Sequence, residues 1–249
     1  MNLYVGTSGY SYKEWKGNFY PKDLPDKEML AYYGTKLPSV EINNTFYRLP
    51  KEAVLKSWAD QVPQAFRFSI KASQRITHIK RLKDALDETE YLIRTVKVIG
   101  EKLGVILFQL PPNFKKDLPR LEQFLKQLPS GVRAAFEFRH ATWFESDVFD
   151  LLRASNCSLC IADADDDLEI PFVATAQWGY LRLRREQYSA TDLKKWMKQV
   201  QSQDWTDAFV FFKHEDEGTG PKLAGQFLAL ADKPGREKPT TSSGGRKSR

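Results

Sequence analysis

Acidic, basic and amide side chains stand at the ends of short apolar segments along the whole chain. They are Glu41, Asn43, Lys71, Gln109, Glu137, Arg139, His140, Asp163, Arg182, Arg184 and Lys213. Carboxylates transfer protons, and arginine binds a carboxylate or a phosphate through two parallel hydrogen bonds. We therefore expect one site that carries out acid–base chemistry on a small anionic or phosphorylated ligand.

Four residues are expected to be catalytic: Glu41, Glu137, Lys71 and His140. Glu41 and Glu137 are the candidates for general base and acid, with His78 or His140 as a proton carrier. Lys71 stands among arginines, which favour its neutral form. A neutral lysine can also act as a nucleophile that forms a Schiff base.

A larger set is expected to bind the substrate. It comprises Asn43, Tyr47, His78, Gln109, Arg139, Trp143, Asp163, Arg182, Arg184 and Lys213. The rings of Tyr10, Tyr47 and Trp143 have the chemistry to stack on a sugar or a base. The alternative is that the aromatic rings pack the first two long loops against each other. The sequence leaves both interpretations open.

Alternation along the expected strands indicates where the charges point, because successive side chains face opposite sides. Glu137 and Arg139 alternate with phenylalanines, and Arg182 and Arg184 alternate with leucines. The apolar set suits an outer face covered by helices, so the charged set is expected inside. Buried charges are costly unless they are paired or used. The charges form either an ion-pair lattice that includes Asp163 or a functional site, and their gathering at one end favours a site.

Eight segments with strand character alternate with helical patterns. The strands are expected at 3–8, 39–46, 67–73, 105–110, 134–139, 158–164, 180–184 and 208–214. Helices are expected at 26–36, 51–61, 79–103, 118–128, 146–154, 191–201 and 221–231, and none between 165 and 177. This order predicts an α/β fold, a single (β/α)8 TIM-type barrel over residues 1–231, with its active site at the carboxyl ends of the strands.

The net charge of +6 is concentrated at the C-terminus. Residues 232–249 hold six Lys or Arg against two Asp or Glu, which leaves residues 1–231 with a net charge of only +2. These last residues are also rich in Gly, Ser, Thr and Pro, so a disordered basic tail is predicted. Such a tail is either a solvated terminus or a weak tether for polyanions.

Other classes of protein and site find little support. No run of 18 apolar residues and no secretory leader is present, so we expect a cytoplasmic protein with no membrane partner. Cys157 and Cys160 form a lone CxxC whose sulfurs would face opposite sides of a strand, which indicates core residues. The three histidines show no metal-binding spacing, so no metal site is predicted, and no cofactor follows from the sequence.

Five motifs occur in order, each at the end of an expected strand. They are GTSGYSYKEWKGNFYP (6–21), EINNTFYRLP (41–50), FSIKAS with ITH (68–73 and 76–78), LFQLPPNF (107–114) and EFRHATWF (137–144). Together they closely resemble the YecE-like family, also called domain of unknown function 72, over about residues 3–215. The resemblance implies a TIM-type barrel that is distantly similar to the sugar isomerase and endonuclease IV barrels, and it implies no settled activity.

The resemblance weakens at the last two strands. Where the family commonly has Tyr-x-Arg-x-His-Gly, this chain has Arg184 and Arg185 in place of the His-Gly pair, and Lys213 and His214 replace a usual Asn-Asn. Both departures imply a more anionic ligand than that of most relatives. The similarity to endonuclease IV makes a nucleic-acid-binding or repair protein the alternative function. The small net charge of residues 1–231 and the shortage of metal ligands argue against it.

Overall fold

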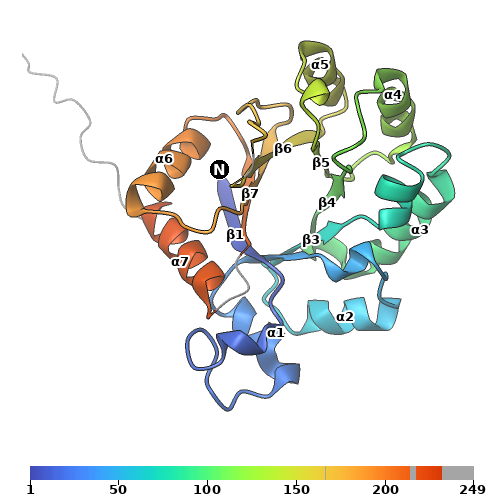
Figure 1. The fold of residues 1–249 in the computed structure, drawn as a ribbon. Helices are drawn as coiled ribbons and strands as arrows, with labels where there is room; N and C mark the ends of the chain where they lie inside the picture. The colour runs from blue at the N-terminus through green and yellow to red at the C-terminus, as the bar shows by residue number, and fades with distance from the viewer. Residues whose placement is uncertain (166, 214–216, 232–249) are drawn as a thin grey trace, which may run out of the picture.

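Eight parallel strands close into a barrel in sequence order, with β8 paired to β1 (Figure 1). The computed structural model describes residues 1–165, 167–213 and 217–231. The strands are β1 (Asn2–Ser8), β2 (Ser39–Ile42), β3 (Arg67–Lys71), β4 (Leu103–Gln109), β5 (Ala134–Glu137), β6 (Ser158–Asp163), β7 (Trp178–Leu183) and β8 (Asp207–Phe212). The predicted (β/α)8 barrel is confirmed.

Helices surround this barrel on its outside (Figure 1). They are α1 (Met29–Gly34), α2 (Glu52–Asp60), α3 (Leu86–Val96), α4 (Leu118–Gln127), α5 (Ser146–Ala154), α6 (Ala190–Gln201) and α7 (Thr219–Ala231). Short helical turns are η1 (Lys13–Trp15), η2 (Asp26–Glu28), η3 (Asn44–Phe46), η4 (Arg75–Ile79), η5 (Lys97–Lys102) and η6 (Ala141–Trp143). As predicted, no helix forms between β6 and β7 in the described residues 165 and 167–177.

The helix predicted over 79–103 is wrong in its extent. Arg81, Leu82 and Asp84 have positive φ angles of 50°, 67° and 50°, which a right-handed helix does not allow. The α-helix therefore begins only at Leu86, and it ends at Val96 before the 3-10 turn η5. Hydrophobic spacing alone does not reveal this break, because the buried Leu82 fits the helical pattern.

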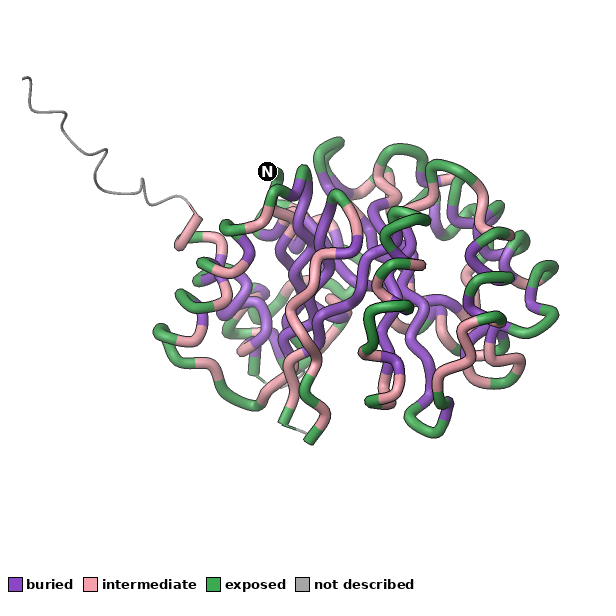
Figure 2. The backbone as a smooth tube through the Cα atoms, turned by 90° about the horizontal axis from the view of Figure 1, so that it is seen from above, coloured by how far each residue is buried: buried purple, intermediate pink, exposed green. Residues whose placement is uncertain are grey.

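Two apolar cores lie on opposite sides of the sheet. The outer core packs alternate strand residues such as Val40, Phe136 and Leu181 against the helices. The inner core fills the barrel with Leu107, Tyr180 and others, and its full membership is Val105, Leu107, Ala135, Cys160, Trp178, Tyr180, Phe209 and Phe211. Figure 2 shows the strands as the buried centre of the molecule. Apolar side chains therefore close most of the barrel, and charge gathers at its carboxyl end.

The C-terminal tail and membrane-spanning helices were the subject of two further expectations. Residues 232–249 lie outside the described part of the chain, as does His214, so the predicted tail stays a prediction. In the residues that the structure covers, no helix has the length and apolar character needed to cross a bilayer.

The contact between β1 and β2 depends on Gly6. A Cβ atom at this position would lie 1.8 Å from the Ser39 carbonyl oxygen and 2.9 Å from the Tyr33 hydroxyl. We predict that Gly6→Ala lowers the free energy of unfolding by roughly 3 kcal/mol, because the neighbouring backbone cannot move aside without breaking the strand pairing. Urea unfolding followed by circular dichroism measures the change.

Gly225 is the matched control, since it lies on the exposed side of α7 and a Cβ atom added to it would have no neighbour within 4 Å. Gly225→Ala should leave stability unchanged or raise it by up to about 1 kcal/mol. Equal stabilities of the two variants would contradict the close packing of β1 on β2.

Candidate functional site

Arg182 joins two glutamates inside the barrel. Its Nη2 donates to Glu41 Oε1 at 2.8 Å and its Nη1 donates to Glu137 Oε2 at 2.6 Å. Glu41 and Glu137 are 0% exposed and Arg182 is 3% exposed. The three residues come from β2, β5 and β7, so one guanidinium ties three separate strands together. The charged set is inside, as the alternation of the sequence predicted.

The remaining carboxylate oxygen sites of Glu41 are also occupied. Ser8 Oγ donates to Oε1 at 2.6 Å, Asn43 Nδ2 donates to Oε1 at 3.1 Å, and Tyr180 Oη donates to Oε2 at 2.7 Å. Ser8 and Tyr180 are outside the set of site residues expected from the sequence. Tyr180 lies two residues before Arg182 on β7, so the period of two could have placed it on the inner face.

Glu137 has an equally complete set of partners. Gln109 Nε2 donates to Oε1 at 2.8 Å and Arg139 Nε donates to the same oxygen at 3.1 Å. Arg184 Nη2 lies 3.6 Å from this oxygen and forms a longer ion pair. Three arginines therefore surround one carboxylate.

Both glutamates are held in the ionised form. Burial opposes ionisation of Glu137, but the charges of Arg182, Arg184 and Arg139 outweigh it and lower the pKa of this carboxyl to about 2. Burial likewise opposes ionisation of Glu41, while Arg182 and the hydrogen bonds from Ser8 and Tyr180 lower its pKa. These carboxylates hold cations in place, and neither is poised to exchange protons near neutral pH.

Cations outnumber carboxylates at this end of the barrel. Arg182, Arg139, Arg184 and Lys71 carry four positive charges against the two glutamates. The Nε atoms of Arg182 and Arg184 are buried and have no hydrogen-bond partner among the described residues. A buried donor without an acceptor is costly, so these two atoms, like the unpaired Asn43 Oδ1, are hydrogen-bonding groups that the described side chains leave unsatisfied.

Lys71 is the cation with the fewest interactions here. Its Nζ lies 4.3 Å from the centre of the Phe46 ring, and within the part of the chain that the structure describes it makes no ion pair or hydrogen bond. Burial and the nearby charge of Arg182 lower the pKa of Lys71 to about 8. Both protonation states of this amine are therefore accessible near neutral pH.

His78 lies beside the same phenylalanine. Its ring contacts Phe46 edge-on with 4.9 Å between centroids, and its Nδ1 is 2.9 Å from Thr77 Oγ1. Burial, followed by the charges of Lys71 and Arg139, lowers the pKa of His78 below its usual value of 6.5. His78 and Lys71 thus share one end of the site, as part of the predicted set.

Asp163 lies outside the barrel, and the expectation that it joins the inner charges is wrong. Ala162, and not Asp163, is in register with Arg182, so Asp163 shares the outer face with Leu183. Its Oδ2 accepts hydrogen bonds from side chains of the β7–α6 loop and of α6. The donors are Arg185 Nε at 2.8 Å, Tyr188 Oη at 2.9 Å and Trp196 Nε1 at 3.1 Å.

Trp143 is a core residue, and its expected contact with a ligand is not supported. It is fully buried, its ring stacks on Phe138 with 4.6 Å between centroids, and its Nε1 donates to the Phe114 carbonyl at 2.7 Å. Tyr10 is partly buried against Tyr33 in the loop after β1. Both rings pack against protein side chains, and neither contact joins the first loop to the second as the alternative interpretation expected.

Three other expected residues follow β2, β5 and β8 in the chain. Tyr47 is 75% exposed and its ring contacts Phe46. The Nδ1 of His140 accepts a hydrogen bond from the Thr142 amide at the start of η6. Lys213 is exposed just after β8. Their roles as binding or catalytic residues stay predictions.

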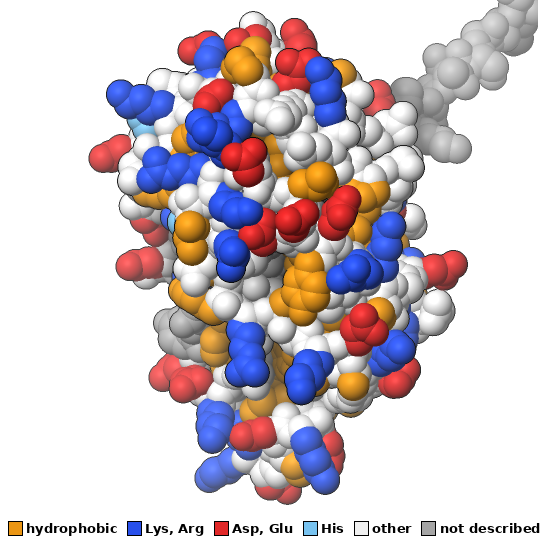
Figure 3. All heavy atoms as spheres, turned by 90° about the vertical axis from the view of Figure 1, so that its right-hand side faces the viewer, with side chains coloured by type: hydrophobic (Ala, Val, Ile, Leu, Met, Phe, Trp, Pro, Cys, Tyr) orange, Lys and Arg blue, Asp and Glu red, His pale blue; other side chains and the backbone are white. Residues whose placement is uncertain are grey.

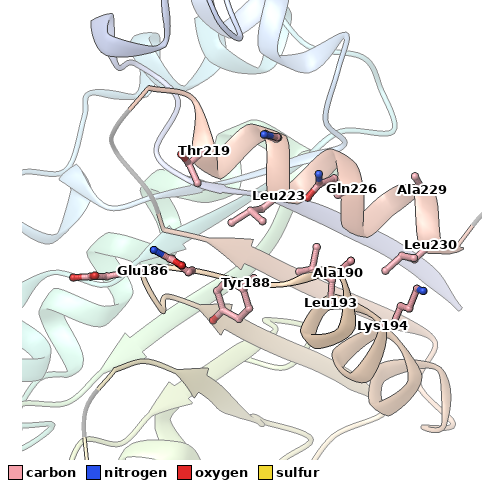
Figure 4. Close-up of a pocket in the computed structure, with 12 residues that line it drawn as sticks. Glu186, Tyr188, Ala190, Leu193, Lys194, Thr219, Leu223, Gln226, Ala229 and Leu230 are labelled. Atoms are coloured by element: carbon pink, nitrogen blue, oxygen red, sulfur yellow. The ribbon is translucent and has the colours of Figure 1, made fainter.

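Two hollows each include one residue that contacts the buried glutamates, Asn43 in one and Arg139 in the other. One of about 320 Å³ is lined by the β1 and β2 loops and includes Asn43, and another of about 380 Å³ is lined by Pro112, Arg139, Asp167 and Leu168. A larger hollow of about 680 Å³ lies between α6 and α7 on the outside of the barrel (Figure 4). The mouth of the barrel, at the carboxyl ends of its strands, is the better candidate site. The side chains with shifted pKa values and the donors without a hydrogen-bond partner gather there.

A site for a metal ion finds no support in the described residues. No three His, Cys, Asp or Glu side chains among them gather as ligands. Cys157 and Cys160 are both buried, on the outer and inner cores respectively, as predicted. Burial raises the pKa of both thiols, so neither is poised as a thiolate ligand.

Comparison with known proteins supports the resemblance seen in the motifs. The model of a family described as "Protein of unknown function DUF72" matches residues 4–245. The UPF0759 protein YunF of Bacillus subtilis (strain 168) is 24% identical over 271 residues, which cover 92% of this chain and 95% of YunF. The UPF0759 protein YecE of Escherichia coli (strain K12) is 31% identical over 144 residues, which cover 57% of this chain and 50% of YecE.

Solved structures show the same fold. A DUF72 family protein from Thermotoga maritima superposes with a TM-score of 0.84 at 27% identity, covering 94% of this chain and 100% of that chain. A DUF72 family protein from Enterococcus faecalis superposes with a TM-score of 0.78 at 16% identity, covering 93% of this chain and 96% of that chain. None of these descriptions states an activity.

Replacement of Arg182 should lower the free energy of unfolding. Arg182→Met leaves Glu41 and Glu137 buried without their shared partner, so we predict a loss of about 3–5 kcal/mol in the free energy of unfolding at pH 7. Arg182 is the only ion-pair partner of Glu41 among the described residues, so the pKa of this carboxyl then rises above that of the unfolded chain and the deficit should shrink as the pH falls toward 5. Urea unfolding at several pH values measures both effects.

Lys71→Met is the matched control, because it removes an inward cation that makes no ion pair among the described residues. Its cost should stay below about 1 kcal/mol. In the unaltered protein, the lowered pKa of Glu137 contributes stability above pH 4.5 that is lost as the pH falls toward 2. A pH-independent deficit in Arg182→Met would contradict the ion-pair assignment.

Asp163 should hold the loop that carries Arg184 and Arg185. The Arg184 amide donates to the Asp163 carbonyl at 2.7 Å, and the Asp163 carboxylate anchors the side chains that follow. We predict that Asp163→Ala speeds amide hydrogen exchange in residues 184–189 by roughly tenfold, the effect of losing about 1.4 kcal/mol of local interactions. Unchanged exchange in this loop, measured by mass spectrometry, would refute the anchoring role.

Proposed function

Because this chain belongs to the DUF72 family of unknown function, we propose its function from its own site: the barrel mouth binds a small anion, a carboxylate or a phosphate, and catalyses acid–base chemistry on it. The proposal goes beyond the family assignment, which names no ligand and no reaction. It rests on the charges and the unused donors at the carboxyl ends of the strands.

The excess of cations carries the proposal. Four cationic side chains face two carboxylates, so the cluster keeps a net charge of +2 if Lys71 is protonated. The Arg184 side chain is only 14% exposed and pairs with Glu137 at the long distance of 3.6 Å, and its buried Nε has no partner among the described residues. Charge-assisted hydrogen bonds from a guanidinium are strong and suited to carboxylate or phosphate oxygens. An anion at the mouth would balance the charge and satisfy these donors.

The proton-transfer step is assigned to Lys71 with His78 beside it. Lys71 has a pKa of about 8, and the pKa of His78 is lowered, so both have a neutral form near pH 7 that can accept a proton. Glu41 and Glu137 keep the arginines in place in this proposal, because both are saturated with hydrogen bonds. This assignment changes the roles that the sequence suggested for the two glutamates.

The side of the protein drawn in Figure 3 offers no clustered basic surface for a nucleic acid. The side of the molecule at the right of Figure 1 carries Lys and Arg intermixed with Asp and Glu (Figure 3). Proteins that bind nucleic acid through phosphates present clustered basic surfaces. The net charge of +2 for residues 1–231 agrees with this mixed surface. The cationic excess is local to the barrel mouth, which favours a ligand of the size of a metabolite.

The binding of inorganic phosphate tests the proposal. Isothermal titration should give saturable binding with one site, and Arg184→Gln should weaken it at least about tenfold through the loss of a charged donor. Arg153→Gln is the matched control, since Arg153 lies in α5 and pairs with Asp150 at the surface. Equal affinities of the two variants would contradict the site.

The same titration has a predicted dependence on pH. The positive charge of Lys71 attracts the anion and is lost as the pH rises through about 8, so affinity should fall above that pH. Lys71→Met should bind more weakly at pH 7 and should lack this step. A step at pH 8 that persists in Lys71→Met would assign the titration to another group.

A further inference from the structure

The surroundings of Lys71 suit covalent chemistry as well as proton transfer. Its amine stands at the end of β3, above the apolar barrel interior, and it is half-buried. It contacts the face of Phe46 and has no ion pair or hydrogen bond within the described residues. A lysine that served only to balance Glu41 and Glu137 would pair with one of them, as Arg182 does with both.

We propose that Lys71 forms a Schiff base with a small aldehyde or ketone that carries a carboxylate or phosphate group, and that Arg184 and Arg139 hold the anionic group. This inference rests on the proposed anion site and names the class of its substrate. The guanidiniums would fix the anionic group. Arg139 lies near enough to Lys71 for its charge to act on the amine, so a carbonyl group of the same ligand would be directed at Lys71.

The chemistry balances without a redox partner. The neutral Nζ of Lys71 adds to the carbonyl carbon, the C–N bond forms, and the carbonyl oxygen takes up a proton to give a carbinolamine. The C–O bond then breaks and the oxygen leaves as water with a further proton. The amine nitrogen loses one of its two protons in this sequence and ends as a protonated, cationic imine. The net reaction consumes one proton and the carbonyl compound, and it releases one water.

The neighbours of Lys71 can assist the attack of the amine, the proton transfers and the formation of the cationic imine. Burial and the charge of Arg182 favour the neutral amine that attacks, and they lower the pKa of Lys71 to about 8. His78 lies against the same Phe46 ring, at 4.9 Å between centroids, where it can carry protons to and from the oxygen that leaves. The carboxylates of Glu41 and Glu137 act in the opposite direction and favour the cationic imine. The face of Phe46 also stabilises a cation.

Reductive trapping tests the proposal. The full chain is incubated at pH 7.5 with glyoxylate, an anionic aldehyde, and sodium cyanoborohydride, and the modified lysines are located by peptide mass spectrometry. Lys126 is the internal reference, because its side chain is 71% exposed. Lys71 should be modified at least about tenfold faster than Lys126, since a lower pKa leaves more of its amine neutral. Modification of Lys71 no faster than that of Lys126 would overturn the proposal.

A second aldehyde distinguishes formation of the Schiff base at Lys71 from binding of the anion by the arginines. Acetaldehyde has no anionic group, so Arg184→Gln should slow trapping by glyoxylate about tenfold and leave trapping by acetaldehyde unchanged. Phosphate should compete only with glyoxylate. If phosphate binds at the mouth but glyoxylate spares Lys71, the Schiff base is refuted and the anion site stands. If both aldehydes react with Lys71 equally and phosphate does not compete, the anion site is refuted.

Discussion

Two glutamates are buried inside the barrel, and their ionised state depends on one arginine that bonds to both. A carboxylate removed from water loses several kcal/mol of solvation, which only close opposite charge and hydrogen bonds can offset. Arg182 provides this at 2.8 Å and 2.6 Å. The arrangement requires β2, β5 and β7 to keep their register, because a shift by one residue would turn a charge into the outer apolar core.

The same arrangement explains why cations remain at the mouth. Glu137 is surrounded by three arginines, and one of them, Arg184, is held at 3.6 Å while its Nε has no partner in the described part of the chain. Burial, together with the charge of Arg182, makes Lys71 a weaker base. Ion pairing in the barrel thus leaves donors for an anion and a reactive amine next to them. The proposed binding and the proposed chemistry both follow from the charge balance around Arg182.

Alternation in the sequence was sufficient to place the inner charges and the eight strands. It placed Glu41, Glu137 and Arg182 correctly, because each lies within a regular strand whose apolar neighbours face the helices. The same alternation places Asp163 outside, because Leu159 and Ile161 of β6 lie in the outer core and Asp163 follows them on the same face. Its expected place among the inner charges therefore did not follow from the pattern. The sequence of one strand does not contain its pairing with its neighbours, so it could not show that Ser8 and Tyr180 meet Glu41. Trp143 was misplaced because a buried ring and a ligand-binding ring look alike in a sequence.

In the proposed site, the barrel mouth takes an anion at the unpaired donors of its arginines. A crystal structure of the protein grown with phosphate tests it most directly. We predict phosphate oxygens within hydrogen-bond distance of Arg184 Nε and close to Lys71, with Arg182 still bridging Glu41 and Glu137. A mouth without phosphate, in which Arg184 Nε is instead bonded to protein groups and the anion lies elsewhere, would contradict the account.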